Sequence, residues 1–209
     1  MKCLFKKIFS IEGNIGAGKS TLLSLLEKSI PNCICIPEPV KEWSNIDGDN
    51  LLKKFYKEPK RWTFTFELYS MFTKAKKIRD ALTSDATTII IERSIFSDRA
   101  FHYISFTYDK LEPMEMSLLD IFFQEYKQDY PPFNGIIYLD TEPSECLKRI
   151  KKRGREEEQG ITLEYLKKLE DQFLSTKYDA QMLMVNGEYT VDEKEKTIQM
   201  IMKFISKCI

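Results

Sequence analysis

The sequence lacks a long apolar run, because no stretch of 18 apolar residues occurs among its 209 residues. A membrane-spanning helix is therefore not expected. The opening segment, residues 1–9, carries lysines, but its apolar run is too short for a signal peptide. We expect an intracellular, cytoplasmic protein with no membrane partner.

The sequence also lacks a net charge, since 32 Lys and Arg residues balance 32 Asp and Glu residues. No field of the whole protein steers it toward nucleic acid, so no nucleic-acid partner is expected. Paired C-x-x-C spacing is missing as well, which favours reduced thiols over disulfides or a zinc site. The five cysteines are Cys3, Cys33, Cys35, Cys146 and Cys208. Without repeats or linkers, the length predicts one domain over residues 1–209.

A glycine-rich stretch, residues 13–20, fits the pattern G-x-x-x-x-G-K-[ST] at every fixed position. An apolar run at residues 8–11 precedes it as a buried strand would, and leucines at helical spacing follow it. Glycines let successive backbone N–H groups turn toward one anion at a helix N-terminus. Lys19 adds a positive charge for the outer phosphates, and the Ser20 hydroxyl is suited to ligate Mg²⁺. The stretch therefore predicts a P-loop.

Two further apolar runs end next to carboxylates. Residues 33–36 predict a short strand before Glu38, and residues 87–91 predict a central parallel strand that leads into Glu92. Ligands of an α/β sheet bind outside the carboxyl ends of its strands, so both carboxylates are expected on the side of the P-loop. Glu92 is placed as a Mg²⁺-associated carboxylate, with Ser20 as the other protein oxygen. A solvated loop glutamate is the alternative for Glu38.

Helical periodicity connects and follows these strands. It predicts helices over residues 49–56, 59–82, 97–102, 114–126, 143–150, 162–176 and 192–206, with strands at 135–139 and 182–185. Within residues 59–82, Phe64, Glu67, Met71 and Lys74 share one face at three- and four-residue steps. A charge inside such an apolar stripe is unusual, although a glutamate at the rim of the core is the alternative.

An arginine-rich segment lies at about residues 149–160. Arginines cluster there before a run of glutamates, and Gly154 and Gly160 are placed to act as hinges of a mobile flap over phosphates. A solvated charged turn is the alternative, because most charge runs are of that kind.

Taken together, these motifs resemble the deoxyribonucleoside kinase family, which includes deoxycytidine and deoxyguanosine kinases. The resemblance covers nearly the whole chain. Its marks, beside the P-loop, are Glu38-Pro39-Val40 with Trp43, Tyr56 before Pro59, the run Arg61 to Phe66, Glu92-Arg93-Ser94 with Ser97-Asp98-Arg99, and Arg153-Gly154-Arg155 leading to Glu157-Glu158-Gln159-Gly160.

The resemblance implies a fold and a reaction. The fold is an α/β P-loop kinase with five parallel strands in the order 2-3-1-4-5, surrounded by helices and carrying the Arg-rich lid at about residues 149–160. The reaction is nucleotide salvage, in which the γ-phosphoryl of ATP passes, with Mg²⁺, to the 5′-hydroxyl of a deoxynucleoside. A homodimer is also implied.

The resemblance also implies roles for individual residues. Glu38 is the general base and Arg93 is the cation beside the 5′-oxygen. Tyr56 and Glu158 hold the sugar 3′-hydroxyl, and Trp43 walls the base pocket. The residues that bind ATP are Gly13, Asn14, Ile15, Gly16, Ala17, Gly18, Lys19, Ser20, Thr21, Arg149, Arg153 and Arg155. These roles agree with the chemistry, because a hydroxyl is a poor nucleophile until a carboxylate takes its proton, and the moving phosphoryl needs cations.

Three substrate-binding positions depart from the family's pattern. Glu67 replaces a glutamine that pairs with the base, His102 replaces a stacking aromatic, and Lys74 replaces an arginine whose acidic partner, Asp98, is kept. An ionised glutamate offers only acceptors, and guanine presents adjacent donors. We expect deoxyguanosine or another purine first, deoxycytidine second and thymidine last. If burial protonates Glu67, it imitates glutamine and the preference reverts.

Two other functions share some of these motifs. A nucleoside monophosphate kinase of the thymidylate kinase type also joins a P-loop to an arginine-bearing lid, but Glu38 would repel its anionic acceptor. A GTPase-like switch needs an Asn-Lys-x-Asp sequence and an Asp-x-x-Gly after a strand, and the chain contains neither.

Overall fold

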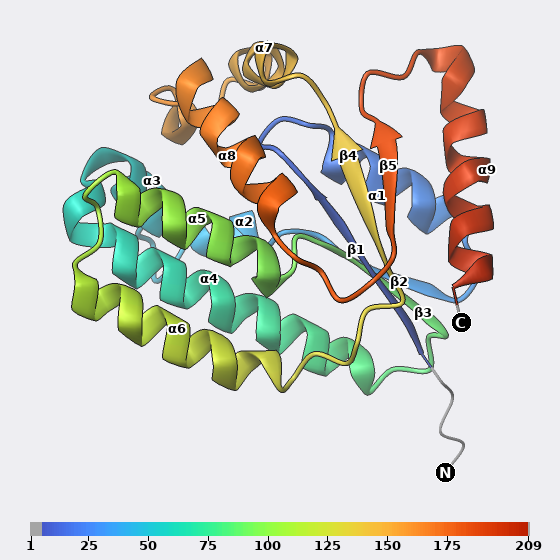
Figure 1. Ribbon diagram of the computed structural model, residues 1–209, viewed down its shortest axis with the longest axis horizontal. Helices are drawn as coiled ribbons and strands as arrows, with labels where there is room; N and C mark the ends of the chain where they lie inside the picture. The colour runs from blue at the N-terminus through green and yellow to red at the C-terminus, as the bar shows by residue number, and fades with distance from the viewer. Residues whose placement is uncertain (1–5, 209) are drawn as a thin grey trace.

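A parallel β-sheet forms the centre of the structure, a computed structural model that describes residues 6–208 (Figure 1). The neighbouring strands all pair in parallel, in the order β2-β3-β1-β4-β5. The strands are β1 (Lys7–Gly13), β2 (Cys33–Ile36), β3 (Thr88–Glu92), β4 (Gly135–Asp140) and β5 (Met182–Asn186). The fold and the strand order implied by the resemblance are thus confirmed.

Helices cover both faces of this sheet (Figure 1). The α-helices are α1 (Lys19–Ser29), α2 (Val40–Trp43), α3 (Leu51–Lys57), α4 (Pro59–Leu82), α5 (Ile95–Thr107), α6 (Pro113–Lys127), α7 (Pro143–Arg153), α8 (Leu163–Ser175) and α9 (Val191–Lys207). Proline stands in the first turn of α4, α6 and α7, where its missing N–H costs nothing. None of the helices between residues 6 and 208 is long and apolar enough to cross a membrane.

The core divides along the alternation of the strands. Phe9 and Ile11 of β1 pack with α1 and α9, whereas Ile8 packs with α4 and α6 on the opposite face. In β3, Ile90 lies on the first face while its neighbours lie on the second. Because both faces are buried, the central strands are nearly continuous apolar runs.

Two short elements were missed by the sequence pattern. They are α2, which follows Glu38, and a 3₁₀ turn, η1 (Glu156–Glu158), within the Arg-rich segment. Elements of three or four residues are too short to show a helical period. Four cysteines, Cys33, Cys35, Cys146 and Cys208, are free thiols in the structure, and Cys3 lies outside the described residues.

Candidate active site

The P-loop joins β1 to α1 and depends on glycine at two close approaches. Gly13 and Gly16 have positive φ angles of 135° and 80°. A Cβ on Gly13 would lie 2.5 Å from the Leu139 carbonyl oxygen, and one on Gly16 would lie 2.6 Å from that of Cys146. Any other residue would force the loop away from β4 and α7. The N-terminus of α1 is thereby held open toward an anion.

Lys19 is buried at the start of α1, and its Nζ donates to the Asn14 carbonyl oxygen at 2.7 Å. Burial, helped by nearby Arg93, lowers the pKa of Lys19 to about 8, and the surrounding carboxylates oppose this shift. The Asn14 side chain donates to the Leu166 carbonyl oxygen at 2.8 Å, so it fixes the loop against α8. The P-loop residues that line the adjoining cavity are Ile15, Gly16, Gly18, Lys19, Ser20 and Thr21.

Ser20 and Glu92 meet at the mouth of the P-loop. The Ser20 hydroxyl donates to Glu92 Oε1 at 2.7 Å, which brings together the two oxygens that the sequence assigned to Mg²⁺. No cluster of three or more His, Cys, Asp or Glu side chains suited to hold a metal occurs among residues 6–208. A hydroxyl and one carboxylate fit Mg²⁺ at such a site, since this ion takes few protein ligands and keeps waters and substrate phosphates.

Glu38 and Arg93 form an ion pair between the P-loop and the helices. Arg93 Nε lies 3.3 Å from Glu38 Oε1, and the arginine has a left-handed backbone with φ of 60°. Its guanidinium lies over the rings of Phe101 and Phe173, at 4.9 and 5.1 Å from their centroids. Burial disfavours the charged form of Glu38, but Arg93, Lys74, Lys19 and Arg155 outweigh it and hold the pKa of Glu38 below its usual range. The carboxylate is therefore ionised and able to accept a proton.

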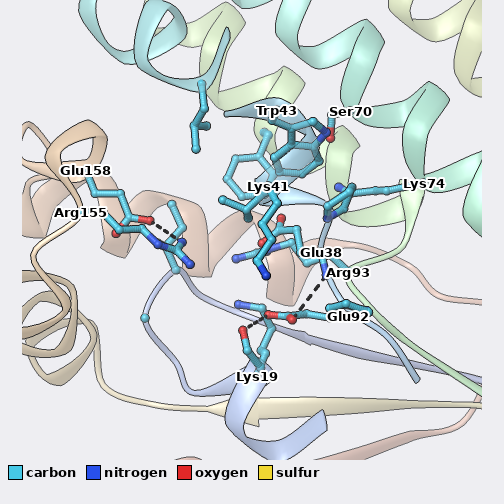
Figure 2. Close-up of a pocket in the computed structure, with 18 of the residues that line it drawn as sticks. Lys19, Glu38, Lys41, Trp43, Ser70, Lys74, Glu92, Arg93, Arg155 and Glu158 are labelled. Atoms are coloured by element: carbon cyan, nitrogen blue, oxygen red, sulfur yellow. Dashed lines mark hydrogen bonds and ion pairs between the residues drawn. The ribbon is translucent and has the colours of Figure 1, made fainter. Parts of the chain in front are cut away.

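One cavity of about 680 Å³ joins these groups to the base-recognition residues expected from the sequence. Figure 2 shows Lys19 and Glu92 at one end, Trp43 and Lys74 at the other, and Glu38 with Arg93 between them. Glu158 and Arg155 form another wall of the cavity. We call the part around Lys19, Ser20 and Glu92 the phosphate end, and the part around Trp43, Glu67 and Lys74 the base end.

The Arg-rich segment folds over the phosphate end through ion pairs of its own. Arg153 Nη2 lies 2.6 Å from Glu158 Oε2, and Arg155 Nη1 lies 3.1 Å from Glu158 Oε1. Arg149 donates to the carbonyl oxygens of Ala17 and Gly187, each at 3.0 Å, and so ties α7 to the P-loop. All three arginines, Glu158 and Tyr56 line the cavity.

The base end carries a buried ion pair, Lys74 with Asp98, that links α4 to α5. The Trp43 indole N–H donates to Thr73 Oγ1 at 3.0 Å, which fixes the ring against α4. Lys74 also lies over this ring, 5.6 Å from its centroid. Burial raises the pKa of Asp98 to about 6, although Lys74 opposes this shift.

Glu67 lies beside this pair and is 2% exposed. Its Oε1 accepts from the Ser105 hydroxyl at 3.4 Å, and its Oε2 lies 3.5 Å from His102 Nε2. Burial, with a contribution from Asp98, raises the pKa of Glu67 to about 8. The protonated alternative is therefore favoured in the pocket at neutral pH.

Some aromatic positions of the site differ from the sequence-based expectation. His102 does not line the cavity, because its side chain is fully buried behind Glu67. Phe101 and Tyr165 line it instead, and both were missed. Helical spacing from Asp98 places Phe101 on the same side of α5, a signal that could have identified it. Nothing in the local sequence marks Tyr165, which comes from α8.

A P-loop after β1, carboxylates at the carboxyl ends of β2 and β3, and arginines over the loop define the class of P-loop phosphotransferases. Within that class, residues 9–209 of the sequence match the model of the deoxynucleoside kinase family. The chain is 38% identical to a probable deoxycytidine kinase of fowlpox virus, over 88% of this chain and 79% of the relative. It is 33% identical to deoxycytidine kinase of Homo sapiens, over 96% of this chain and 91% of the relative. It is 35% identical to a mitochondrial deoxyguanosine kinase of Xenopus laevis, over 79% of this chain and 71% of the relative.

The chain therefore belongs to the deoxynucleoside kinase family. Members of this family are ATP-dependent nucleoside kinases, so the predicted family, the phosphotransfer reaction and ATP as the donor are confirmed. The residue roles and the preferred base remain predictions.

Proposed function

We propose that this protein phosphorylates the 5′-hydroxyl of deoxyguanosine, another purine deoxynucleoside or deoxycytidine in preference to thymidine. The observation that carries the proposal is the Glu38–Arg93 ion pair between the two ends of one cavity. A carboxylate at that point suits a neutral hydroxyl acceptor and repels a phosphorylated one. The names of the relatives, deoxycytidine and deoxyguanosine kinases, point to the same acceptors.

In this mechanism, Glu38 is the general base. A Glu38 carboxylate oxygen takes the proton of the 5′-hydroxyl as the bond from O5′ to the γ-phosphorus forms. The bond from that phosphorus to the β,γ-bridging oxygen breaks, and ADP leaves with the electron pair. Arg93 stabilises the charge that develops on the 5′-oxygen, and its ion pair with Glu38 keeps the carboxylate ionised until the acceptor arrives.

The phosphate end stabilises the transferring group. Lys19 reaches the outer phosphates, and Arg153 with Arg155 faces the equatorial oxygens of the phosphoryl in the transition state. Ser20 and Glu92 would hold Mg²⁺, which supplies charge neutralisation to the phosphates when it is bound. We infer that the segment of about residues 149–160 acts as the lid of a single domain.

The base and sugar are bound by the opposite half of the cavity. Tyr56 and Glu158 are placed to hold the 3′-hydroxyl, and Trp43 forms a wall for the base. Lys74 and Asp98 form the buried ion pair beside this wall, and Glu67 lines the cavity where the base edge would lie. Thymine offers one N–H between two carbonyls, so an ionised Glu67, which presents only acceptors, has its poorest partner in thymine.

The proposal is tested by the choice of acceptor. Purified protein with Mg-ATP is given each of the four deoxynucleosides and, separately, each of the four deoxynucleoside monophosphates, and the products are separated by chromatography. We expect monophosphate products from deoxyguanosine and deoxycytidine at higher kcat/KM than from thymidine. Diphosphate products from the monophosphates alone would show a nucleoside monophosphate kinase, and ATP or GTP hydrolysis without acceptor transfer would show a switch.

We also propose a homodimer that forms through α6 and the adjoining part of α4. Met114, Leu118 and Ile121 are exposed along one face of α6, and Phe72 is exposed on α4, which packs beside α6. An apolar helix face of this kind is typical of an interface. Light scattering should give twice the mass of 24.6 kDa, and Ile121→Glu should reduce it to that of the monomer.

A further inference from the structure

Glu67 and His102 form a buried pair on two facing helices, α4 and α5, at the base end of the cavity. Glu67 lines the cavity, and His102 lies behind it with its Nε2 3.5 Å from Glu67 Oε2. Neither ring nitrogen of His102 has a hydrogen-bond partner within the part of the chain that the structure describes. A fully buried imidazole without partners is costly, so its place beside Glu67 calls for an explanation.

This pair can hold one proton in two places. In the neutral form, Glu67 is a carboxylic acid that presents one donor and one acceptor, and His102 is an uncharged imidazole. In the charged form, the proton has left the carboxyl oxygen for Nε2, so that Glu67 presents two acceptors and His102 is an imidazolium. The total number of protons is the same in both forms.

The two forms match two kinds of base edge. A donor beside an acceptor, as in the amide-like neutral acid, pairs with N3 and the amino group of cytosine. Two acceptors pair with N1–H and the amino group of guanine. A glutamine offers only the first pattern, because it has no proton to give up.

We propose that His102 is a positioning residue that accepts the Glu67 proton when a base with two adjacent donors binds, and returns it when a base with one donor and one acceptor binds. The pair would thus let one site read guanine and cytosine. This inference rests on the proposed function and deepens it.

The charged groups around the pair set its resting form. Lys74 comes from α4, Asp98 and Arg99 from α5, Lys110 from the loop after α5, and the Tyr165 hydroxyl from α8. Burial and the nearby charge of Asp98 raise the pKa of Glu67 to about 8. Burial and the nearby charges of Lys74 and Arg99 lower the pKa of His102 to about 3. The pair is therefore neutral before substrate binds.

A base edge with two adjacent donors favours the charged form of the Glu67–His102 pair over the neutral form. Two N–H groups aimed at Glu67 stabilise its carboxylate. The ionised carboxylate, 3.5 Å from Nε2, then raises the affinity of the ring for the proton.

A direct test uses the fact that His102 is the only histidine of the chain. Protein without a histidine tag, labelled with ¹⁵N-histidine, gives the ring-nitrogen NMR signals of this residue alone. At pH 7 we expect imidazolium signals with saturating deoxyguanosine and neutral-ring signals with saturating deoxycytidine. The same protonation state with both nucleosides would overturn the proposal.

A kinetic test follows the ratio of kcat/KM for deoxyguanosine to that for deoxycytidine between pH 6 and 7.5. Groups common to both reactions cancel in this ratio. In the wild type the pair keeps its proton, so the ratio should not change with pH. In His102→Gln the proton must leave to solvent, so the ratio should rise about tenfold per pH unit. His102→Phe should give the same slope if the glutamine variant does not fold.

Glu67→Gln is the control for this test, and its ratio should be low and independent of pH. A wild-type slope equal to that of the His102 variants, or flat ratios in those variants, would overturn the role of His102. Neither result would affect the proposed function, which fails only if no deoxynucleoside is phosphorylated or if deoxynucleosides other than those proposed are preferred.

Discussion

The two ends of the cavity satisfy their polar groups to different degrees. At the phosphate end, Lys19 has a carbonyl partner, Ser20 is bonded to Glu92, and Arg153 is paired with Glu158. At the base end, Asp98 Oδ2 and both ring nitrogens of His102 are buried with no partner among the described residues.

The difference follows from what each end must bind. The phosphates and the transferred group are the same for every acceptor, so the groups that bind them can be fixed in advance. The base varies, and a site for it must either reject some edges or adapt to them. The three positions at which the sequence analysis expects a departure from the family pattern, Glu67, Lys74 and His102, all lie at the base end.

Glu38→Gln should have the largest effect, and it tests the chemical step that takes place between the phosphate end and the base end. The amide cannot take the hydroxyl proton, so kcat should fall by about 10²- to 10⁴-fold while ATP binding survives. Single-turnover kinetics and an ATP-binding titration measure both quantities. Glu42→Gln is the matched control, because Glu42 lines the same cavity but pairs with Lys77. Near-normal turnover in Glu38→Gln would remove the general base from this position.

Arg155→Ala should have the next largest effect and concerns the lid. An arginine aimed at the transition state contributes about 10²-fold in kcat, with a smaller effect on the KM for the deoxynucleoside. Lys152→Ala, an exposed change on the adjoining α7, is the control and should leave both constants unchanged. A rise in deoxynucleoside KM with unchanged kcat would place Arg155 with the acceptor, and so with the base end.

Glu67→Gln should alter the ranking of acceptors with little effect on the chemical step. Its fixed donor and acceptor should move kcat/KM away from deoxyguanosine toward deoxycytidine or deoxyadenosine. One mispaired buried polar group costs about 1 to 3 kcal/mol, so the shift should be tenfold or more. Steady-state kinetics with the natural deoxynucleosides measures it. An unchanged ranking would break the comparison, since the base end would then not read the base through Glu67.

The smallest effect concerns stability without substrate. The pKa of Glu67 rises from 4.5 to about 8 on folding, so its contribution is fully present below pH 4.5 and is lost as pH rises toward 8. Asp98 acts in the same direction only up to about pH 6. Between pH 6.5 and 7.5 the wild type should lose about 1 kcal/mol more than Glu67→Gln in free energy of unfolding. Urea titrations measure this, and parallel losses in both proteins would show that Glu67 is not protonated.

The fold and the phosphate end could be predicted because their signals are local. Residues 13–20 are contiguous, the strands are apolar runs, Glu92 ends β3, and Glu38 comes two residues after the end of β2. The base end could be predicted only in part, because its groups meet across helices. Helical spacing identified Glu67 and Lys74, but the contact of Glu67 with His102 depends on how α4 packs against α5, and Tyr165 arrives from α8. Burial decides the charge of Glu67, and burial is a property of the folded chain.

Glu158 is the one carboxylate that both lid arginines share in the ion pairs described, and it also borders the expected sugar site. We expect the arginines to turn to the phosphates of a bound donor, which would remove the counter-ions of Glu158 and leave it free to accept from a sugar hydroxyl. On this hypothesis, donor binding and acceptor binding are thermodynamically coupled. By reciprocity, the factor by which ATP tightens deoxynucleoside binding must equal the factor by which the deoxynucleoside tightens ATP binding.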